Sequence, residues 1–313
     1  MASDSTELRW TRTRNNVAGT TSPPLVKFHR GREEFVRILC CVNRDIESNY
    51  ALNLLLPELA RAPHTVRVIL SEHVGNQAVP AAIRALRAVE QAIPNELLFP
   101  LVMRCVVAQT RSLTFDELTV YCDGEPLRAV NLNAAAGLTL LDSFAPEVIL
   151  TIRYGHILRE RAIAHAKHGV INLHSGLLPQ YRGILSTLYA MANGDADIGC
   201  TLHWIVDPGI DSGPIIAIAR RPVEQGRSLF WHIMSLYPLG VPLIVEVVRR
   251  LTSGEPVPRQ VQPAVEGTYR STPTAADVEI LTSRGIELFD AEDLRETFAR
   301  FVPLAGVPAS SAS

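Results

Sequence analysis

Short apolar runs alternate with longer amphipathic segments along the middle of the chain. Residues 35–42 and 65–70 are apolar runs of strand length, and residues 48–59 between them have the spacing of a helix. Residues 147–152 and 169–173 predict two further buried strands. Strands that alternate with helices are typical of a parallel sheet, so the pattern predicts an α/β protein with a β-α-β opening.

The pattern is less regular between residues 77 and 130. Residues 81–92 predict a helix, residues 95–119 fit a helix followed by a loop, and residues 119–122 fit a short strand. This pattern leaves the topology of the insert open. Helical spacing returns in two later segments, residues 138–144 and 228–250.

Composition divides the chain into three parts. Residues 1–33 are polar and rich in Ser, Thr, Arg and Asn, which predicts a flexible N-terminal arm. Residues 34–252 hold the predicted main domain. Residues 253–313 open with glycine and several prolines and contain an amphipathic segment at 292–302, so we expect a small C-terminal appendage with a frayed end.

The overall charge favours a small-molecule partner. The chain has 30 Lys and Arg against 32 Asp and Glu, a formal net charge of -2. A protein that binds nucleic acid through its phosphates needs a concentration of basic residues, and this composition gives no sign of one. We therefore expect no nucleic-acid partner.

The cysteines and the N-terminus indicate a reduced, cytoplasmic protein. Its five cysteines form no C-x-x-C pair, which predicts neither a zinc site nor a disulfide framework: Cys40, Cys41, Cys105, Cys122 and Cys200. The first residues lack the pattern of a signal peptide, and the sequence is read as having no run of the ~18 apolar residues of a membrane helix. The sequence predicts a cytoplasmic enzyme without a membrane partner.

Two polar segments carry the candidate chemistry. Asn172 and His174 lie two residues apart at the end of the predicted strand 169–173, so their side chains point the same way. The carboxyl ends of such strands are where open α/β sheets bind ligands. About 35 residues later, a turn-rich loop carries Asp207 and Asp211. An amide, an imidazole and a carboxylate that converge suit acyl transfer to an amine.

These segments resemble the folate-dependent formyltransferases. The resemblance rests on N-x-H followed by S-x-L-L-P-x-Y-R-G in residues 172–183, N-G-D in 193–195, and D-x-G-x-D-x-G-P-I in 207–215. It runs from about residue 144 to 223. It implies a Rossmann-like formyltransferase fold, a mostly parallel sheet with helices on both faces, and a formyl donor, 10-formyltetrahydrofolate.

The resemblance assigns the catalytic roles to Asn172, His174 and Asp211. The chemistry agrees, because an amide and a protonated imidazole can hydrogen-bond a developing oxyanion, and a carboxylate can hold the imidazolium and accept protons through a water. Asp207 is the alternative carboxylate, although turn aspartates commonly cap their own backbone. Asp211 precedes Ser-Gly-Pro as in the family, but the loop before it is about one residue longer, which leaves its reach open.

The resemblance also suggests where the folate and the acceptor bind. The pterin would lie between the segment after strand 147–152 and the loop before Asp211; the residues concerned are Tyr154, Gly155, His156, Ile157, Leu158, Val206, Asp207 and Ile210. Arg182 fits either a contact with an acceptor phosphate or carboxylate or a role in ordering its loop. His203 fits either a place in the site or one in the core. His165 and His168 have a spacing that suits a metal, but no acidic or cysteine ligand accompanies them and formyl transfer needs none.

The acceptor is expected to be a primary amine of a small molecule in a specialised biosynthetic pathway, such as a sugar nucleotide. Methionyl-tRNA formyltransferases resemble the core but add a longer basic domain, and residues 253–313 hold few Lys or Arg. Purine transformylases lack the appendage and the 77–130 insert. The alternatives are those two activities and a folate- or nucleotide-binding protein without catalysis, and the prediction leaves room for a homodimer.

Overall fold

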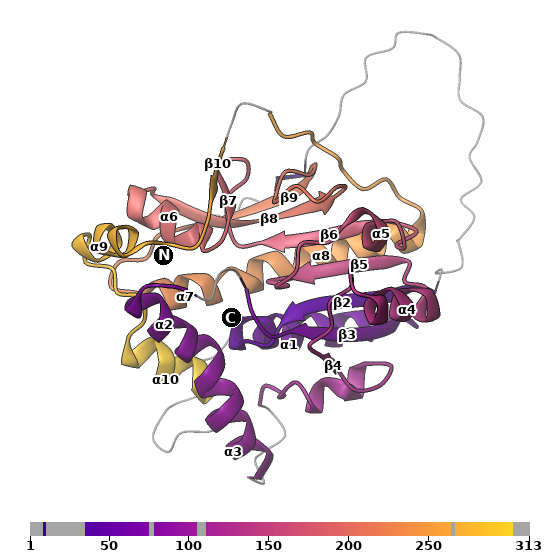
Figure 1. The fold of residues 1–313 in the computed structure, drawn as a ribbon, viewed down its shortest axis with the longest axis horizontal. Coiled ribbons are helices and arrows are strands. Elements are labelled where there is room, and N and C mark those ends of the chain that lie inside the picture. The colour runs from indigo at the N-terminus through magenta and orange to yellow at the C-terminus, as the bar shows by residue number, and fades with distance from the viewer. Residues whose placement is uncertain (1–8, 11–34, 75–77, 105–110, 264–266, 303–313) are drawn as a thin grey trace, which may run out of the picture.

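The computed structural model describes residues 9–10, 35–74, 78–104, 111–263 and 267–302 (Figure 1). Within these residues one sheet has the strand order β1-β9-β8-β6-β5-β2-β3-β4. The five strands of the parallel part are β2 (Arg37–Asn43), β3 (Thr65–Ser71), β4 (Leu127–Arg128), β5 (Val148–Ile152) and β6 (Val170–His174). The antiparallel part is β8 (Asp197–Ile205), β9 (Ile215–Pro222) and β1 (Arg9–Trp10).

Helices cover both faces of this sheet, as the sequence predicts (Figure 1). Alternate residues of β2 point to opposite faces, so Ile38 and Cys40 join one apolar core and Leu39 and Cys41 the other. The larger core includes α1 (Ile46–Leu59) and α8 (Tyr237–Ser253). The smaller core includes α4 (Ala135–Phe144) and the single turn of α5 (Glu160–Ile163). The mostly parallel α/β fold is therefore confirmed.

The predicted helix at 228–250 is two helices. α7 (Leu229–Met234) ends at Ser235, and α8 begins at Tyr237, with a proline as its second residue. The segment from 229 to 253 contains an 18-residue window with a mean hydropathy of 1.4, which is long and apolar enough to cross a membrane, so the sequence interpretation that no such run exists is wrong. In the fold 61% of that apolar window is buried, and α8 packs against α1, β8 and β9. The run serves as a core helix.

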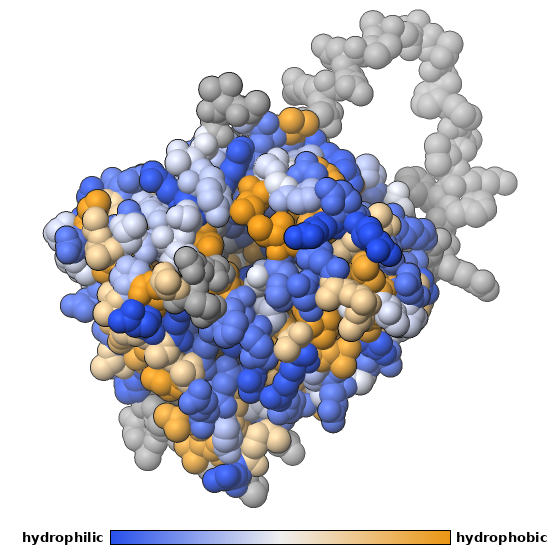
Figure 2. Space-filling model, in the orientation of Figure 1, coloured by the Kyte–Doolittle hydropathy of each residue, from blue (hydrophilic) through white to orange (hydrophobic). Residues whose placement is uncertain are grey.

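The insert is mostly helical. α2 (Ala81–Arg87) continues through two π-helical segments, η1 (Ala88–Ala92) and η2 (Pro94–Leu98), into α3 (Phe99–Arg104). Three apolar side chains of this long helix, Leu97, Leu101 and Met103, are more than half exposed. The space-filling view shows apolar surface at the lower end of the molecule, where Figure 1 labels α3 (Figure 2).

The predicted strand at 119–122 is wrong. Residues Glu117–Tyr121 form the 3-10 helix η3, and the short edge strand β4 comes later. The reason is local capping: the Glu117 carboxylate accepts a hydrogen bond from Thr114 N (2.9 Å), and Glu117 N donates to Thr114 Oγ1 (3.4 Å). This reciprocal pair fixes a helical turn, which outweighs the β-branched side chains that follow.

The C-terminal residues pack on the part of the chain predicted as the main domain. β10 (Thr268–Arg270) pairs in parallel with β7 (Tyr181–Gly183), and α9 (Ala275–Ser283) packs on α6 (Ser186–Asn193). After α10 (Ala291–Ala299), Phe301 is buried in the larger core. The boundary at 252/253 stays a prediction. The predicted appendage packs against the rest of the fold through β10, α9 and Phe301.

Some sequence predictions fall outside the described residues. These are most of the arm 1–33, of which only Arg9 and Trp10 are described, the frayed end beyond residue 302, and Cys105. The four described cysteines are free thiols.

Candidate active site

Strand β6 places Asn172 between its two neighbouring strands. In the sheet register, Asn172 pairs with Thr151 of the parallel strand β5 and with His203 of the antiparallel strand β8. Thr151 Oγ1 donates to Asn172 Oδ1 (2.8 Å), and Asn172 Nδ2 contacts His203 Nε2 (3.0 Å). The amide is thus held on both sides, with its nitrogen directed toward β8.

His203 has a tautomer that its partners define. Its Nδ1 lies 3.0 Å from the carbonyl oxygen of Trp204, which requires a proton on Nδ1. Nε2 of the neutral ring then accepts from Asn172 Nδ2. If Nε2 also took a proton, that N–H would face Asp211 Oδ1, which is 3.3 Å away. His203 is buried, so its contacts are all within the protein or the pocket.

His174 ends strand β6 with both ring nitrogens facing acceptors. Nε2 lies 2.7 Å from the carbonyl oxygen of Tyr181, and Nδ1 lies 3.5 Å from Asp211 Oδ2. An imidazolium at this position therefore finds an acceptor for each of its N–H groups. Gly176 lets the loop pass over the ring, because a Cβ there would lie 2.5 Å from His174 Nε2.

Asp211 brings its carboxylate to the centre of the site. Its backbone has a φ of 50°, a left-handed conformation that turns the loop inward. Gly183 N donates to Asp211 Oδ2 (2.8 Å), and Gln262 Nε2 donates to the carbonyl of Asp211 (2.9 Å). Burial raises the pKa of this carboxyl, but the charge of His174, the contacts with His203 and the Gly183 N–H outweigh burial and hold the pKa well below its ordinary value.

Asp207 remains on the outer part of the loop. Its carboxylate accepts from Gly209 N (2.7 Å), which is the self-capping expected of a turn aspartate. Asp211, in contrast, contacts Asn172, His174 and His203 at 3.3–3.5 Å. Charge-assisted hydrogen bonds are shorter, about 2.7–2.9 Å. The four side chains therefore lie next to one another, but at distances longer than those of charge-assisted hydrogen bonds. Of the two aspartates, Asp211 is the one that reaches the amide and the imidazole.

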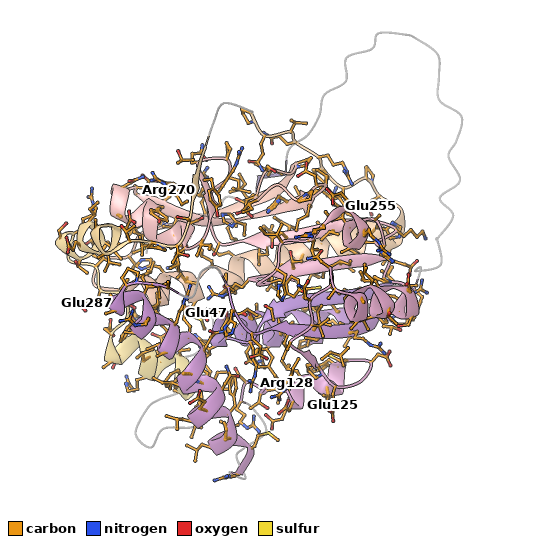
Figure 3. All side chains as sticks on the ribbon, in the orientation of Figure 1. Glu47, Glu125, Arg128, Glu255, Arg270 and Glu287 are labelled. Atoms are coloured by element: carbon orange, nitrogen blue, oxygen red, sulfur yellow. The ribbon has the colours of Figure 1, made fainter. Side chains whose placement is uncertain are left out.

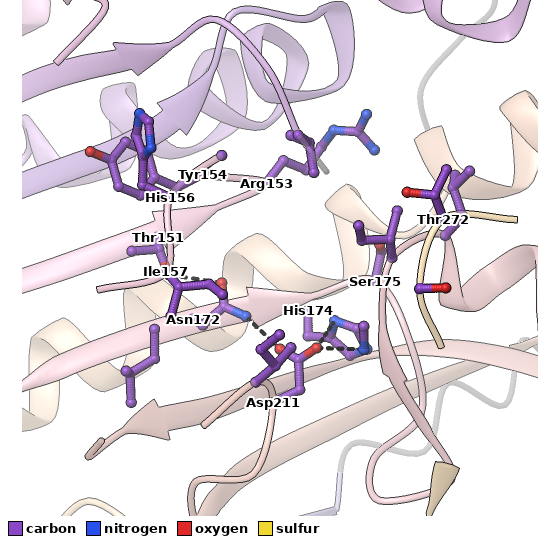
Figure 4. Close-up of a pocket in the computed structure, with 18 of the residues that line it drawn as sticks. Thr151, Arg153, Tyr154, His156, Ile157, Asn172, His174, Ser175, Asp211 and Thr272 are labelled. Atoms are coloured by element: carbon purple, nitrogen blue, oxygen red, sulfur yellow. Dashed lines mark hydrogen bonds and ion pairs between the residues drawn. The ribbon is translucent and has the colours of Figure 1, made fainter. Parts of the chain in front are cut away.

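A cavity of about 440 Å³ opens beside these residues (Figure 4). It is lined by all five residues of the predicted pterin segment and by Asp207 and Ile210 of the opposite loop. Gly155 is required there, because a Cβ would lie 1.6 Å from the carbonyl oxygen of His73. Tyr154 donates its hydroxyl to the carbonyl of Val130 (2.7 Å), which fixes the segment. Val206 is 47% exposed and is not among the described residues that line the cavity.

The other predicted residues lie as follows. His203 lines the cavity. Arg182, on β7, donates to Gln262 Oε1 (3.4 Å) and does not line the cavity as described, so its contact with an acceptor stays a prediction. His165 contacts Asp142 Oδ1 (3.0 Å). Among the described residues no group of three or more His, Cys, Asp or Glu could hold a metal.

Sequence reasoning missed several residues that build the cavity. Thr151, Glu90, Arg153, Tyr269 and Thr272 line it from three separate parts of the chain. Arg153 carried a signal, because a lone arginine directly after a buried strand needs an acidic partner inside the fold. The other four carried none, since their places depend on which segments lie side by side.

Comparison with known proteins agrees with the resemblance to formyltransferases that the sequence motifs indicate. Residues 101–229 match the family model described as formyl transferase. The chain is 31% identical over 145 residues to a methionyl-tRNA formyltransferase of Syntrophomonas wolfei, and 34% identical over 139 residues to one of Thermus thermophilus. These matches cover 46% and 44% of this chain, and 46% and 45% of the relatives, so the chain aligns with less than half of each relative's length.

Two solved structures have the same fold. A glycinamide ribonucleotide transformylase of Symbiobacterium toebii superposes with a TM-score of 0.51 and 17% identity, covering 76% of this chain and 99% of that one. A sugar N-formyltransferase of a Shewanella species gives 0.50 and 14%, covering 85% and 87%. At these identities the likeness shows the fold alone. The family model therefore shows a formyl transferase match over residues 101–229, and the two solved structures show the fold.

Proposed function

We propose that this protein transfers the formyl group of 10-formyltetrahydrofolate to a primary amine of a small molecule. The observation that carries the proposal is the convergence of Asn172, His174 and Asp211 on one cavity. A protein that only binds folate or nucleotide does not need this combination, which disfavours the non-catalytic alternative.

The cavity fits a reduced folate on the side of residues 154–158. Ile157 is 56% exposed and offers an apolar wall, and Ile210 stands on the opposite loop. Main-chain groups of residues 154–158 would hydrogen-bond the edge of the ring. The bound folate would supply the formyl carbon.

The chain's own groups would then stabilise charge and move protons. As the amine nitrogen bonds to the formyl carbon, negative charge develops on the formyl oxygen, where Asn172 Nδ2 and the His174 imidazolium can donate. Asp211, kept ionised by its surroundings, balances the imidazolium and accepts the proton that the amine loses through a water. The bond from the formyl carbon to the folate nitrogen breaks, and that nitrogen takes up a proton.

Folate binding without metal is the first expected result. The described site has carboxylate, amide and imidazole groups whose contacts are with one another, and the proposed chemistry requires no Lewis acid. We expect 5-formyltetrahydrofolate, a stable mimic of the donor, to bind in calorimetry with equal affinity in the presence and absence of a chelator. Loss of binding with chelator would require a metal in the site.

The acceptor is proposed to be a sugar nucleotide or another small metabolite, and not tRNA. Residues 253–313 contain five arginines, no lysine and nine carboxylates, which makes this end of the chain acidic. A tRNA-binding surface needs the opposite charge, because affinity for nucleic acid comes largely from cations that neutralise phosphates.

A paired assay tests this choice of acceptor. Labelled formyl transfer to charged initiator tRNA is compared with transfer to aminosugar nucleotides and amino-acid-derived amines at about 150 mM salt, near physiological ionic strength. We expect negligible formylation of the tRNA and turnover of at least one amine. Efficient tRNA formylation would contradict the small-molecule assignment.

A further inference from the structure

A side chain from the C-terminal segment (described residues 258–263 and 267–272) holds the aspartate loop, residues 206–214. Gln262 is 7% exposed, and its Nε2 donates to the carbonyl oxygens of Asp211 (2.9 Å) and Gly213 (2.6 Å). Its Oε1 accepts from Arg182 Nη2 (3.4 Å). Two carbonyl acceptors on one side and a guanidinium donor on the other define which way the amide faces. One amide therefore binds the main chain of the loop at two points.

The backbone next to Gln262 is itself fixed to the sheet. Gln260 N donates to the carbonyl of Ile215 (2.9 Å), and Ile215 N donates to the carbonyl of Gln260 (2.7 Å). Pro258 contributes a carbonyl that accepts from Trp204 Nε1 (3.0 Å). Trp204 belongs to β8 and Ile215 to β9, the two strands that the aspartate loop joins. Gln262 thus acts from a support that these strands provide.

The conformation of Asp211 needs such a constraint. Its φ of 50° lies in the left-handed region, which residues other than glycine adopt seldom and keep where the surroundings impose it. Its carboxylate lies 3.5 Å from His174 Nδ1 and 3.3 Å from His203 Nε2, close to the limit of direct contact. A small shift of the loop would therefore separate the carboxylate from both rings.

The same segment also acts on the carboxylate, through β7. β10 pairs with β7, and Ile184 N donates to the carbonyl of Arg270 (3.0 Å), a residue labelled in Figure 3. Gly183 permits this approach, because a Cβ there would lie 2.0 Å from Arg270 O. Gly183 N in turn donates to Asp211 Oδ2 (2.8 Å). The C-terminal segment therefore reaches Asp211 twice, at the main chain through Gln262 and at the carboxylate through β7.

We propose that Gln262 is a positioning residue for Asp211, and that the C-terminal segment is part of the active site. The inference rests on the proposed function for the catalytic role of Asp211. It extends that function beyond the residues that match the family model, which end at 229. Gln262 is not among the described residues that line the cavity, so it acts through the aspartate loop and keeps Asp211 beside His174 (Figure 4).

A double-mutant cycle on the full chain tests the coupling, with 10-formyltetrahydrofolate and an accepted amine as substrates. Gln262→Met keeps a side chain of similar size and removes both N–H donors. We expect kcat to fall about tenfold, because a small misplacement of a catalytic group is costly. In the Asp211→Asn background the same substitution should cost less than about twofold, since no carboxylate is left to position. A purely structural role predicts the tenfold loss in both backgrounds, because independent effects add to within about twofold.

A control and a second variant complete the cycle. Gln225→Met makes the same exchange at an exposed position that does not line the cavity, and should keep the wild-type kcat. Thermal unfolding checks that each variant folds. If Gln262→Met does not fold, Gln262→Asn replaces it, because its amide is one methylene shorter and should give the same coupling. A folded Gln262 variant with wild-type kcat, or equal losses in the two backgrounds, would overturn the inference.

Acid unfolding reports on the position of Asp211 without any substrate. Burial raises the pKa of Asp211, but the charge of His174 and the contacts with His203 and Gly183 N hold the pKa below the unfolded value of about 3.9. The resulting stability is present above that value and is lost as the pH falls through the lowered pKa. In Gln262→Met the carboxylate leaves the two rings and its pKa rises toward the ordinary value. The free energy of unfolding should then change less with pH below about pH 4 than in wild type.

The two readouts separate this inference from the proposed function. Formyl transfer by the wild type, with unchanged kcat and an unchanged acid profile in Gln262→Met, would overturn the positioning role alone. A flattened acid profile in Gln262→Met, with no formyl transfer by the wild type to any amine, would support the positioning of Asp211 and contradict the formyltransferase assignment.

Discussion

His174→Ala and Asn172→Ala are each expected to lower kcat for formyl transfer by a factor on the order of 10² or more, because each removes a donor to the developing oxyanion. The structure gives both side chains a fixed orientation. Asn172 is held between Thr151 and His203, and His174 is held by the carbonyl of Tyr181. Steady-state assays with 10-formyltetrahydrofolate and an accepted amine measure the effect.

Folate affinity distinguishes lost catalysis from lost folding in these variants. The proposed folate side of the cavity comes from residues 154–158 and 207–210, which neither substitution changes. The dissociation constant for 5-formyltetrahydrofolate should therefore stay near the wild-type value. His165→Ala, in the turn after α5 and outside the residues that line the cavity, is the control and should turn over normally. Near-wild-type turnover in either site variant would remove that residue from the mechanism.

Asp211→Asn is expected to cause a loss of turnover of similar size, on the order of 10², since the imidazolium of His174 loses its counter-charge. The amide keeps the shape of the side chain, so the hydrogen bond from Gly183 N survives on the remaining oxygen. Asp142→Asn is the matched control, because that carboxylate is exposed and does not line the cavity. Equal activity in the two variants would contradict the assignment of Asp211.

The pH dependence of stability gives a second readout for Asp211. Its pKa is lower in the folded protein than the unfolded value of about 3.9, so its contribution to stability is present above that value. The contribution is lost as the pH falls through the lowered pKa. Protonation of Asp211 should therefore contribute to acid unfolding of the wild type and not of Asp211→Asn. The free energy of unfolding of the variant should change less with pH below about pH 4. Identical acid profiles would count against the lowered pKa.

The regular part of the fold could be predicted because its periodicity is local. Strands β2 and β3 and helix α1 follow directly from apolar runs of the right length. The 3-10 helix η3 in the insert could not be predicted in this way. Thr119 and Val120 favour a strand, but the hydrogen bonds between Thr114 and Glu117 fix the preceding turn as helical. Local side-chain hydrogen bonds determine the structure of such a segment, and the number of β-branched residues gives no information about them.

The site divides in the same way. Asn172 and His174 were predictable from a spacing of two on one strand, and Asp211 from the motif around it. Thr151 was not, because it reaches Asn172 through the pairing of β5 with β6, whose register no single segment encodes. Glu90 and Arg153 meet across 63 positions of the chain, and their pairing depends on how the insert folds over the sheet.

The most direct test of the central claim is transfer of a labelled formyl carbon from 10-formyltetrahydrofolate to small amines, with wild type and His174→Ala measured side by side. The account predicts a formylated amine that carries the label with wild type, and a yield lower by about two orders of magnitude with the variant. Wild-type protein that binds the folate but formylates no amine, or equal yields from the two proteins, would contradict it.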